Sequence, residues 1–253
     1  MKFKDCNRRS FIKNAALGGM MAVSIPEILA AAIPAGKEQK VSLSKNSVIL
    51  FQGDSITDSG RNREDNNYNS ARAMGSGYAM LSGAALLEKY PELDLRVYNK
   101  GISGNKVYQL AERWEIDCLD IKPDVLSILI GVNDIWHKLD GHYNGTIEIY
   151  KNDYVNLIER TKKSLPDIKL VICEPFAVQG VKAVDAKWYP EFYGYQKAAR
   201  EIALKFGATF IPLQKVFDEA QKHAPGSYWT NDGVHPSLAG SQLMARAWLT
   251  AIN

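Results

Sequence analysis

Short apolar runs alternate with longer amphipathic stretches along most of this chain. Runs that are apolar at nearly every position are typical of strands buried on both faces of a sheet. Stretches with apolar residues three or four positions apart predict helices with one buried face. We expect five strands, at residues 47–53, 95–99, 125–130, 169–174 and 209–211. We expect helices at residues 77–90, 107–119, 146–164, 192–206, 216–222 and 237–251.

The alternation of strands and helices predicts an α/β fold. Parallel strands need crossover connections, and helices in those connections cover both faces of the sheet. We therefore expect one domain over residues 47–253, with a five-stranded parallel sheet. Two long connections, residues 58–74 and 176–190, interrupt the alternation. The first begins beside the end of the first strand, so it can serve as a substrate rim or as a plain surface loop.

The first 32 residues are interpreted as an export signal. Basic residues end in Arg-Arg-Ser-Phe-Ile-Lys at residues 8–13, and the apolar run at residues 15–25 is too short to span a bilayer. The paired arginines resemble the twin-arginine motif, and an ordinary secretory signal is the alternative. Residues 30–32, all alanine, offer a cleavage point, and residues 33–46 are expected to be a linker.

This interpretation predicts an exported bacterial protein that is periplasmic or extracellular. The export machinery would be a transient partner, and no membrane-spanning segment would remain after cleavage. Of the three cysteines, Cys6 lies in the signal, and we expect Cys118 and Cys173 to be buried thiols. A disulfide between them remains an alternative in an oxidising compartment.

Composition and charge place the remainder among ordinary soluble domains. The 253-residue chain is 46% hydrophobic and 23% charged. Its net charge of +3 is carried by the first 32 residues, which hold five basic and two acidic side chains. The remaining body is neutral, so we expect no nucleic-acid partner and no anionic membrane surface as a partner.

Chemically useful residues follow the first three predicted strands. Ser55 comes after the first strand, Gly104 after the second and Asn133 after the third. Because the carboxyl ends of parallel strands meet at one edge of a sheet, we expect these residues to converge. The serine hydroxyl is a candidate nucleophile. The N–H groups of Ser55 and Gly104 and the amide of Asn133 are candidate oxyanion donors. Taken singly, each residue is also common in turns and caps.

His235 is the candidate base for Ser55. It lies three residues after Asp232 in a glycine-containing turn, so the carboxylate can fold back and orient the imidazole. His137 and His142 are interpreted as rim or surface residues, because we find no convincing metal-ligand spacing around them. We expect no metal and no cofactor.

Four short blocks carry a family resemblance. They are Gly-Asp-Ser at residues 53–55, Gly-Ile-Ser-Gly at 101–104, Gly-Val-Asn-Asp at 131–134 and Asp-Gly-Val-His-Pro at 232–236. In this order they resemble the blocks of the SGNH hydrolases, also called GDSL lipases and esterases. The resemblance implies a flavodoxin-like, three-layer α/β/α fold and ester hydrolysis without a metal.

The resemblance also implies roles for individual residues. Ser55 would be the nucleophile, His235 the base and then the acid, and Asp232 the carboxylate that orients the histidine. Ser55, Gly104 and Asn133 would form the oxyanion hole. The serine lies near the start of the mature chain, unlike the serine of the Gly-x-Ser-x-Gly elbow of α/β-hydrolases.

Aromatic residues suggest a carbohydrate substrate. Trp136 follows the third block, and Tyr228 and Trp229 precede the fourth, so they can stack on sugar rings or simply pack the loops. We find no long apolar lid for a fatty chain. The resemblance to carbohydrate esterases implies O-deacetylation of a small or polymeric carbohydrate through an acyl-enzyme. The alternatives are a lipid-directed esterase (a lysophospholipase or thioesterase) and a non-catalytic carbohydrate-binding protein.

Overall fold

A single parallel sheet forms the middle of the molecule. The computed structural model describes residues 24–33 and 40–253. All strand pairs are parallel, and the strand order is β2-β1-β3-β4-β5. This is the flavodoxin-like order, and it confirms the predicted five-stranded parallel sheet. The strands are β1 (Val48–Gly53), β2 (Arg96–Asn99), β3 (Val125–Leu129), β4 (Lys169–Cys173) and β5 (Thr209–Ile211).

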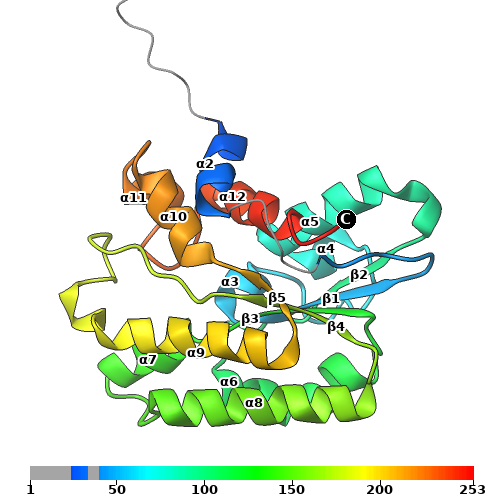
Figure 1. Cartoon of the computed structure of the whole chain (residues 1–253), viewed down its shortest axis with the longest axis horizontal. Helices are drawn as coiled ribbons and strands as arrows, with labels where there is room; N and C mark the ends of the chain where they lie inside the picture. The colour runs from blue at the N-terminus through cyan, green and yellow to red at the C-terminus, as the bar shows by residue number, and fades with distance from the viewer. Residues whose placement is uncertain (1–23, 34–39) are drawn as a thin grey trace, which may run out of the picture.

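Helices cover both faces of the sheet, as Figure 1 shows. Every residue of β1 and β3 is buried, which explains why these strands are apolar without alternation. One layer consists of α2 (Ile25–Ala32), α5 (Tyr78–Lys89), α10 (Leu213–Gln221) and α12 (Leu238–Leu249). The other contains α6 (Val107–Glu112), α8 (Ile147–Ser164) and α9 (Glu191–Phe206).

Several short elements differ from the expected pattern. The helix predicted over residues 107–119 ends early, and a π-helical turn follows at Glu115–Leu119. There the side chain of Gln52 donates a hydrogen bond to the carbonyl of Asp117 at 2.7 Å. Stretches for which no helix was predicted hold α3 (Ser55–Asp58), α4 (Ala71–Met74), α7 (Val132–Leu139), η3 (Ala186–Trp188) and α11 (Gly226–Trp229), and η1 (Pro91–Leu93) precedes β2.

Large aromatic side chains fix the sheet against its helices. The ring of Phe51 in β1 lies 4.8 Å from that of Trp248 in α12 and 5.8 Å from that of Tyr78 in α5. The indole N–H of Trp248 donates to the Ser127 hydroxyl at 2.9 Å, so burial leaves this donor satisfied. Cys118 and Cys173 are buried and free, as the buried-thiol interpretation predicts, and burial raises the pKa of each to about 12.

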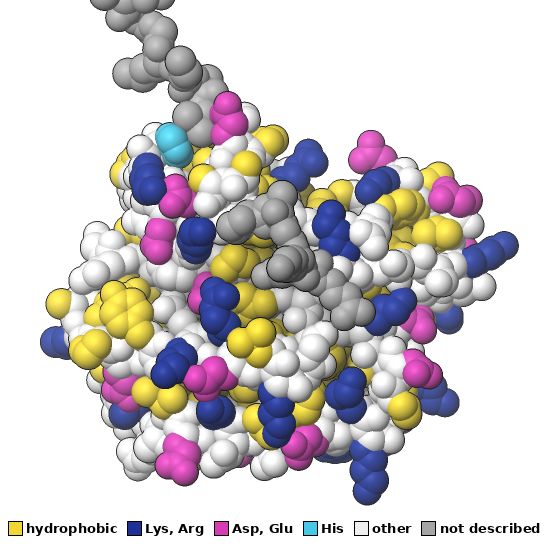
Figure 2. Space-filling view, in the orientation of Figure 1, with side chains coloured by type: hydrophobic (Ala, Val, Ile, Leu, Met, Phe, Trp, Pro, Cys, Tyr) yellow, Lys and Arg dark blue, Asp and Glu magenta, His cyan; other side chains and the backbone are white. Residues whose placement is uncertain are grey.

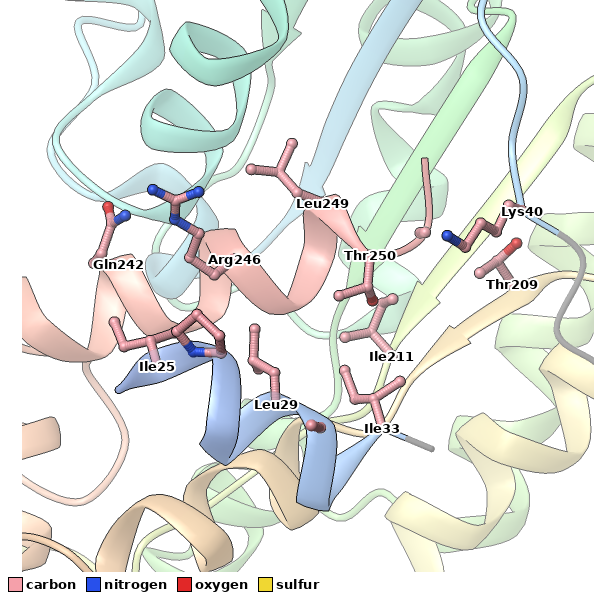
Figure 3. Close-up of a pocket in the computed structure, with 13 residues that line it drawn as sticks. Ile25, Leu29, Ile33, Lys40, Thr209, Ile211, Gln242, Arg246, Leu249 and Thr250 are labelled. Atoms are coloured by element: carbon pink, nitrogen blue, oxygen red, sulfur yellow. The ribbon is translucent and has the colours of Figure 1, made fainter. Parts of the chain in front are cut away.

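The beginning of the chain packs against the body. Residues 1–23 of the predicted export signal lie outside the described residues, but its last part forms α2, whose Leu29 is only 9% exposed. The expected linker is packed where it is described, since the Val41 N–H donates to the Ala251 carbonyl at 2.7 Å. A cavity of about 890 Å³ lies between α2, β5 and α12, with Leu29, Ile33 and Ile211 among its lining residues (Figure 3).

Charges are spread over the face shown in Figure 2, where Lys and Arg side chains alternate with Asp and Glu. Within residues 24–33 and 40–253, no helix is both long and apolar enough to cross a membrane.

Candidate active site

The turn after β1 presents Ser55 at the carboxyl edge of the sheet. Gly53 has a φ of +157°, and a Cβ there would lie 2.3 Å from the Leu129 carbonyl oxygen, so the close strand contact requires glycine. Asp54 then caps α3 by accepting the Ile56 N–H at 3.0 Å. Ser55 is the first residue of α3, and the N–H groups of a first helical turn have no acceptor within their own helix.

Ser55, His235 and Asp232 are in hydrogen-bond contact. The Ser55 Oγ lies 2.8 Å from the His235 Nε2, although 180 positions separate the two residues. The His235 Nδ1 lies 2.7 Å from the Asp232 Oδ2. The contact with Asp232 fits the tautomer that carries its proton on Nδ1, which leaves Nε2 to accept the serine proton. The structure thus brings together the three residues that the sequence analysis selected.

The Asp232 carboxylate is held by its own loop. Its Oδ1 accepts the N–H groups of Val234 at 2.9 Å and His235 at 2.8 Å. Partial burial raises the pKa of Asp232, but the hydrogen bonds from His235 and Val234 outweigh burial and hold that pKa below its usual value. Asp232 is therefore a carboxylate suited to orient the imidazole at neutral pH.

The loop carrying Gly104 is tied to the helix of Ser55. The Oδ2 of Asp58, at the end of α3, accepts the Ser103 N–H at 2.9 Å and the Ser103 hydroxyl at 2.7 Å. Gly104 has a φ of +84°, and a Cβ there would meet no atom within 4 Å, so the backbone borders open space. Asp58 was not among the residues predicted from the sequence, where its only signal is a carboxylate one helical turn after Ser55.

Asn133 is held next to the same loop. It is the second residue of α7 and is 5% exposed, and its Nδ2 donates to the Asn105 carbonyl at 3.2 Å. Asn105 directly follows Gly104, so the three candidate oxyanion donors lie on connected segments. Because α7 is helical from Val132 onward, the position of Asn133 is fixed by backbone hydrogen bonds.

Two carboxyl groups are buried beside these residues. Burial raises the pKa of Asp54, which precedes Ser55, to about 7. Burial likewise raises the pKa of Asp134, which follows Asn133, to about 7. The Oδ2 of Asp54 has no hydrogen-bond partner among the described residues. These acids differ in environment from Asp232, although all three belong to the recognised blocks.

A small cleft opens beside Ser55 and His235. Its volume is about 380 Å³. The predicted rim residue Trp136 lies close to it, with its ring 6.1 Å from the His235 ring. The buried ring of Trp188 lies 5.6 Å from that of Trp136. The cleft is lined by Ser55, Ile56, Ser59, Ser76, Asn231, His235, Pro236, Ser237, Leu238 and Ser241.

The other two predicted rim residues are placed differently from Trp136. Trp229 is only 6% exposed, and its indole N–H donates to the Ala220 carbonyl at 3.1 Å, so it packs in the core. Tyr228 is 55% exposed, and its ring packs edge-on against that of Trp229. The structure therefore brings Trp136 to the His235 ring and turns Trp229 away from solvent.

Comparisons with known proteins agree with this geometry. The model of the GDSL-like Lipase/Acylhydrolase family matches residues 51–243. An acetylxylan esterase from Geobacillus stearothermophilus is 36% identical over 218 residues, which are 84% of this chain and 96% of that protein. A crystallised GDSL-like lipase candidate from Parabacteroides merdae is 54% identical, with a TM-score of 0.83 over 84% of this chain and 98% of that one. An acetyl-xylooligosaccharide esterase from Geobacillus is 34% identical, with a TM-score of 0.76 over 83% and 96% of the two chains.

Proposed function

The chain belongs to the GDSL-like lipase/acylhydrolase family of carboxylic ester hydrolases, and we propose that it removes acetyl groups from carbohydrates. The observation that carries the catalytic part is the hydrogen-bonded series Ser55–His235–Asp232, with distances of 2.8 and 2.7 Å. A hydroxyl next to an oriented imidazole is the arrangement that acyl transfer to serine needs.

In the proposed first half-reaction, the Ser55 Oγ attacks the ester carbonyl while the His235 Nε2 takes the hydroxyl proton. Asp232 keeps the Nδ1 proton in place and stabilises the imidazolium that forms. The N–H groups of Ser55 and Gly104 and the Asn133 amide donate to the oxyanion. Collapse of the tetrahedral intermediate breaks the bond to the sugar oxygen, and His235 gives that oxygen its proton.

In the second half-reaction, water attacks the acetyl-serine carbonyl. The His235 Nε2 takes a proton from this water, and the same donors receive the second oxyanion. When the acyl bond to Ser55 breaks, His235 returns the proton to the Ser55 Oγ and acetate leaves. These steps need only protein groups and water.

Three observations support an acetylated carbohydrate as substrate. The cleft beside Ser55 is lined by hydroxyl and amide side chains, among them Ser59, Ser76 and Asn231, which suits a hydroxyl-rich substrate. The partly exposed ring of Trp136 lies 6.1 Å from that of His235 and can offer an apolar face to a sugar ring, while the buried ring of Trp188 packs against it. The similar Geobacillus sequence and structure carry the names acetylxylan esterase and acetyl-xylooligosaccharide esterase.

The decisive test is acetate release from acetylated xylo-oligosaccharides and other acetylated polysaccharides. The purified enzyme should release acetate, and Ser55→Ala should not. 4-Nitrophenyl esters of increasing acyl length provide the matched comparison, and we expect acetate to be hydrolysed faster than octanoate or longer chains. A clear preference for long chains would instead favour a lipid-directed esterase.

We also propose that the protein is exported by the twin-arginine route. The support is the sequence of residues 8–13, which follows two lysines and precedes a short apolar run. The test is cell fractionation of the native producer or a bacterial host. Replacing Arg8 and Arg9 by lysine should retain the protein in the cytoplasm. Replacing Lys2 and Lys4 by arginine should leave export unchanged, and equal export of both variants would contradict the proposed route.

A further inference from the structure

A turn at the end of α7 gathers two imidazoles and a carboxylate. One ligand atom each from His137, Asp140 and His142 lies within 4.8 Å of the other two. The His142 Nδ1 is 2.9 Å from the Asp140 Oδ1, and the His137 Nδ1 is 3.7 Å from the Asp140 Oδ2. The two histidines had been interpreted as rim or surface residues. Asp140 supplies the third group that the sequence pattern did not reveal.

The backbone holds these three residues in one tight turn. The His142 N–H donates to the His137 carbonyl at 2.8 Å and lies 3.2 Å from the Asp140 Oδ1. Gly141 between them has a φ of +80°, which lets the chain reverse and return His142 toward the helix. The three groups are therefore near one another before any ligand arrives, which reduces the entropy that binding must overcome.

We propose that His137, Asp140 and His142 bind a divalent transition-metal ion of the zinc type. Imidazole nitrogen and carboxylate oxygen are ligands for Zn²⁺ at about 2.0–2.2 Å, and three protein ligands leave a fourth position open. Tetrahedral bonds of that length separate the ligand atoms by about 3.3–3.6 Å. The two contacts to Asp140, at 2.9 and 3.7 Å, lie on either side of this range. With its side chain 76% exposed, His142 leaves the turn open to an ion from solvent.

The proposed site is separate from the Ser55–His235 pair but is connected to it through α7. Asn133 and His137 are four residues apart on α7, so they lie on one face of the helix, one turn from each other. Trp136 precedes His137 and has its ring 6.1 Å from that of His235. A bound ion would anchor the end of the helix that carries both the amide donor and the aromatic rim.

The test uses the full-length enzyme after treatment with a chelator. Zn²⁺ binding is measured by titration calorimetry, and Co²⁺ serves as a second probe because its visible absorption reports the ligand geometry. We expect one ion per chain. His142→Ala and Asp140→Asn should each weaken binding by more than the about 10–100-fold that loss of a hydrogen-bond partner to a ligand costs.

His223→Ala is the matched control, because this exposed histidine follows α10 and belongs to neither cluster. It should bind Zn²⁺ like the wild type, while His235→Ala should keep the Co²⁺ spectrum of the proposed site. The proposal is overturned if the wild type binds no ion at about 1 mM. It is also overturned if His142→Ala binds like the wild type, or if His235→Ala alone abolishes binding.

Discussion

Asp232 and Asp54 both lie next to the proposed catalytic pair, yet their surroundings are opposite. Asp232 has a side chain that is 27% exposed, and hydrogen bonds from its own loop hold its pKa low. Asp54 is fully buried, and burial raises its pKa to about 7. One oxygen of Asp54 caps α3, and the other has no partner within the described residues.

The surroundings of a carboxyl group, rather than its residue type, therefore determine its role in this site. Hydrogen bonds to an ion favour the charged form, whereas removal from water favours the neutral form. Asp232 is therefore suited to stabilise an imidazolium. Asp54 is suited to shape the turn that presents Ser55. Four experiments test this contrast, in order of the expected free-energy effect.

Asp232→Asn should have the largest effect. Loss of the orienting carboxylate lets the imidazole adopt the wrong tautomer, and we expect kcat to fall by about 10⁴-fold. Asp54→Asn is the matched control, because the amide oxygen can still cap α3, and its kcat should fall by less than about tenfold. Steady-state hydrolysis of 4-nitrophenyl acetate measures both. A similar decrease of kcat in both variants would contradict the different roles assigned to Asp232 and Asp54.

Asn133→Ala tests whether a buried polar residue can contribute to catalysis as well as to the fold. Asn133 is buried like Asp54, but its amide is a proposed oxyanion donor, so kcat should fall by about 10²–10³-fold. KM should change little, because the lost interaction forms in the transition state. Asn156→Ala, on the exposed side of α8, is the control. A normal kcat in Asn133→Ala would remove this residue from the oxyanion hole.

Asp54 should also make stability fall as pH rises. Its pKa is about 7 in the folded protein and near the ordinary value of 3.8 in the unfolded chain, so between these values only the folded state keeps the proton. Between pH 5 and pH 8, the free energy of unfolding of the wild type should therefore fall by about 3 kcal/mol through Asp54. Asp54→Asn should not show this decrease. Urea unfolding at both pH values measures it. An equal stability difference between the two proteins at pH 5 and pH 8 would contradict the expectation.

Asp232 should act in the opposite direction. Its pKa is lower in the folded protein than in the unfolded chain, so its stabilising contribution is present above the unfolded pKa. That contribution is lost as pH falls through the folded pKa. Below the ordinary carboxyl pKa of 3.8, the slope of stability against pH should therefore decrease in Asp232→Asn and stay unchanged in Asp54→Asn.

Trp136→Ala should have the smallest effect of the four. Stacking of an aromatic ring is worth about 0.5–1.5 kcal/mol, so KM for acetylated xylo-oligosaccharides should rise about 2- to 12-fold. KM for 4-nitrophenyl acetate, which presents no sugar, should stay near the wild-type value. An equal rise for both substrates would mean that Trp136 supports His235 rather than a sugar ring.

The sheet and the residues around Ser55 could be predicted from the sequence because each depends on local signals. Apolar runs such as 48–51 mark strands buried on both faces, and parallel topology brings their ends together. Asp232 and His235 are close in the chain, so their contact depends on a single turn. Ser55 and His235 can then meet because both of their loops lie at the carboxyl edge of the sheet.

The remaining features depend on packing between distant segments, which cannot be predicted from the spacing of apolar residues along the chain. Trp136 and Trp229 are equally aromatic and equally close to a recognised block, but only the fold decides that Trp229 is buried against α10. The helix α7 begins inside a block that looks like a turn, and at eight residues it is too short to show a clear period. Asp140 becomes a candidate metal ligand only because the folded turn places it next to His137 and His142.

The long separation between Ser55 and His235 affects how activity appears during synthesis. A chain leaves the ribosome from its N-terminus, so β1 and Ser55 are complete well before the final fifth of the protein exists. The loop with His235 is closed by a bridge between Thr230 and Pro236 and continues directly into α12. A nascent or truncated chain that ends before this loop holds Ser55 without its proposed base. Hydrolytic activity therefore reports that the whole chain has been made and folded.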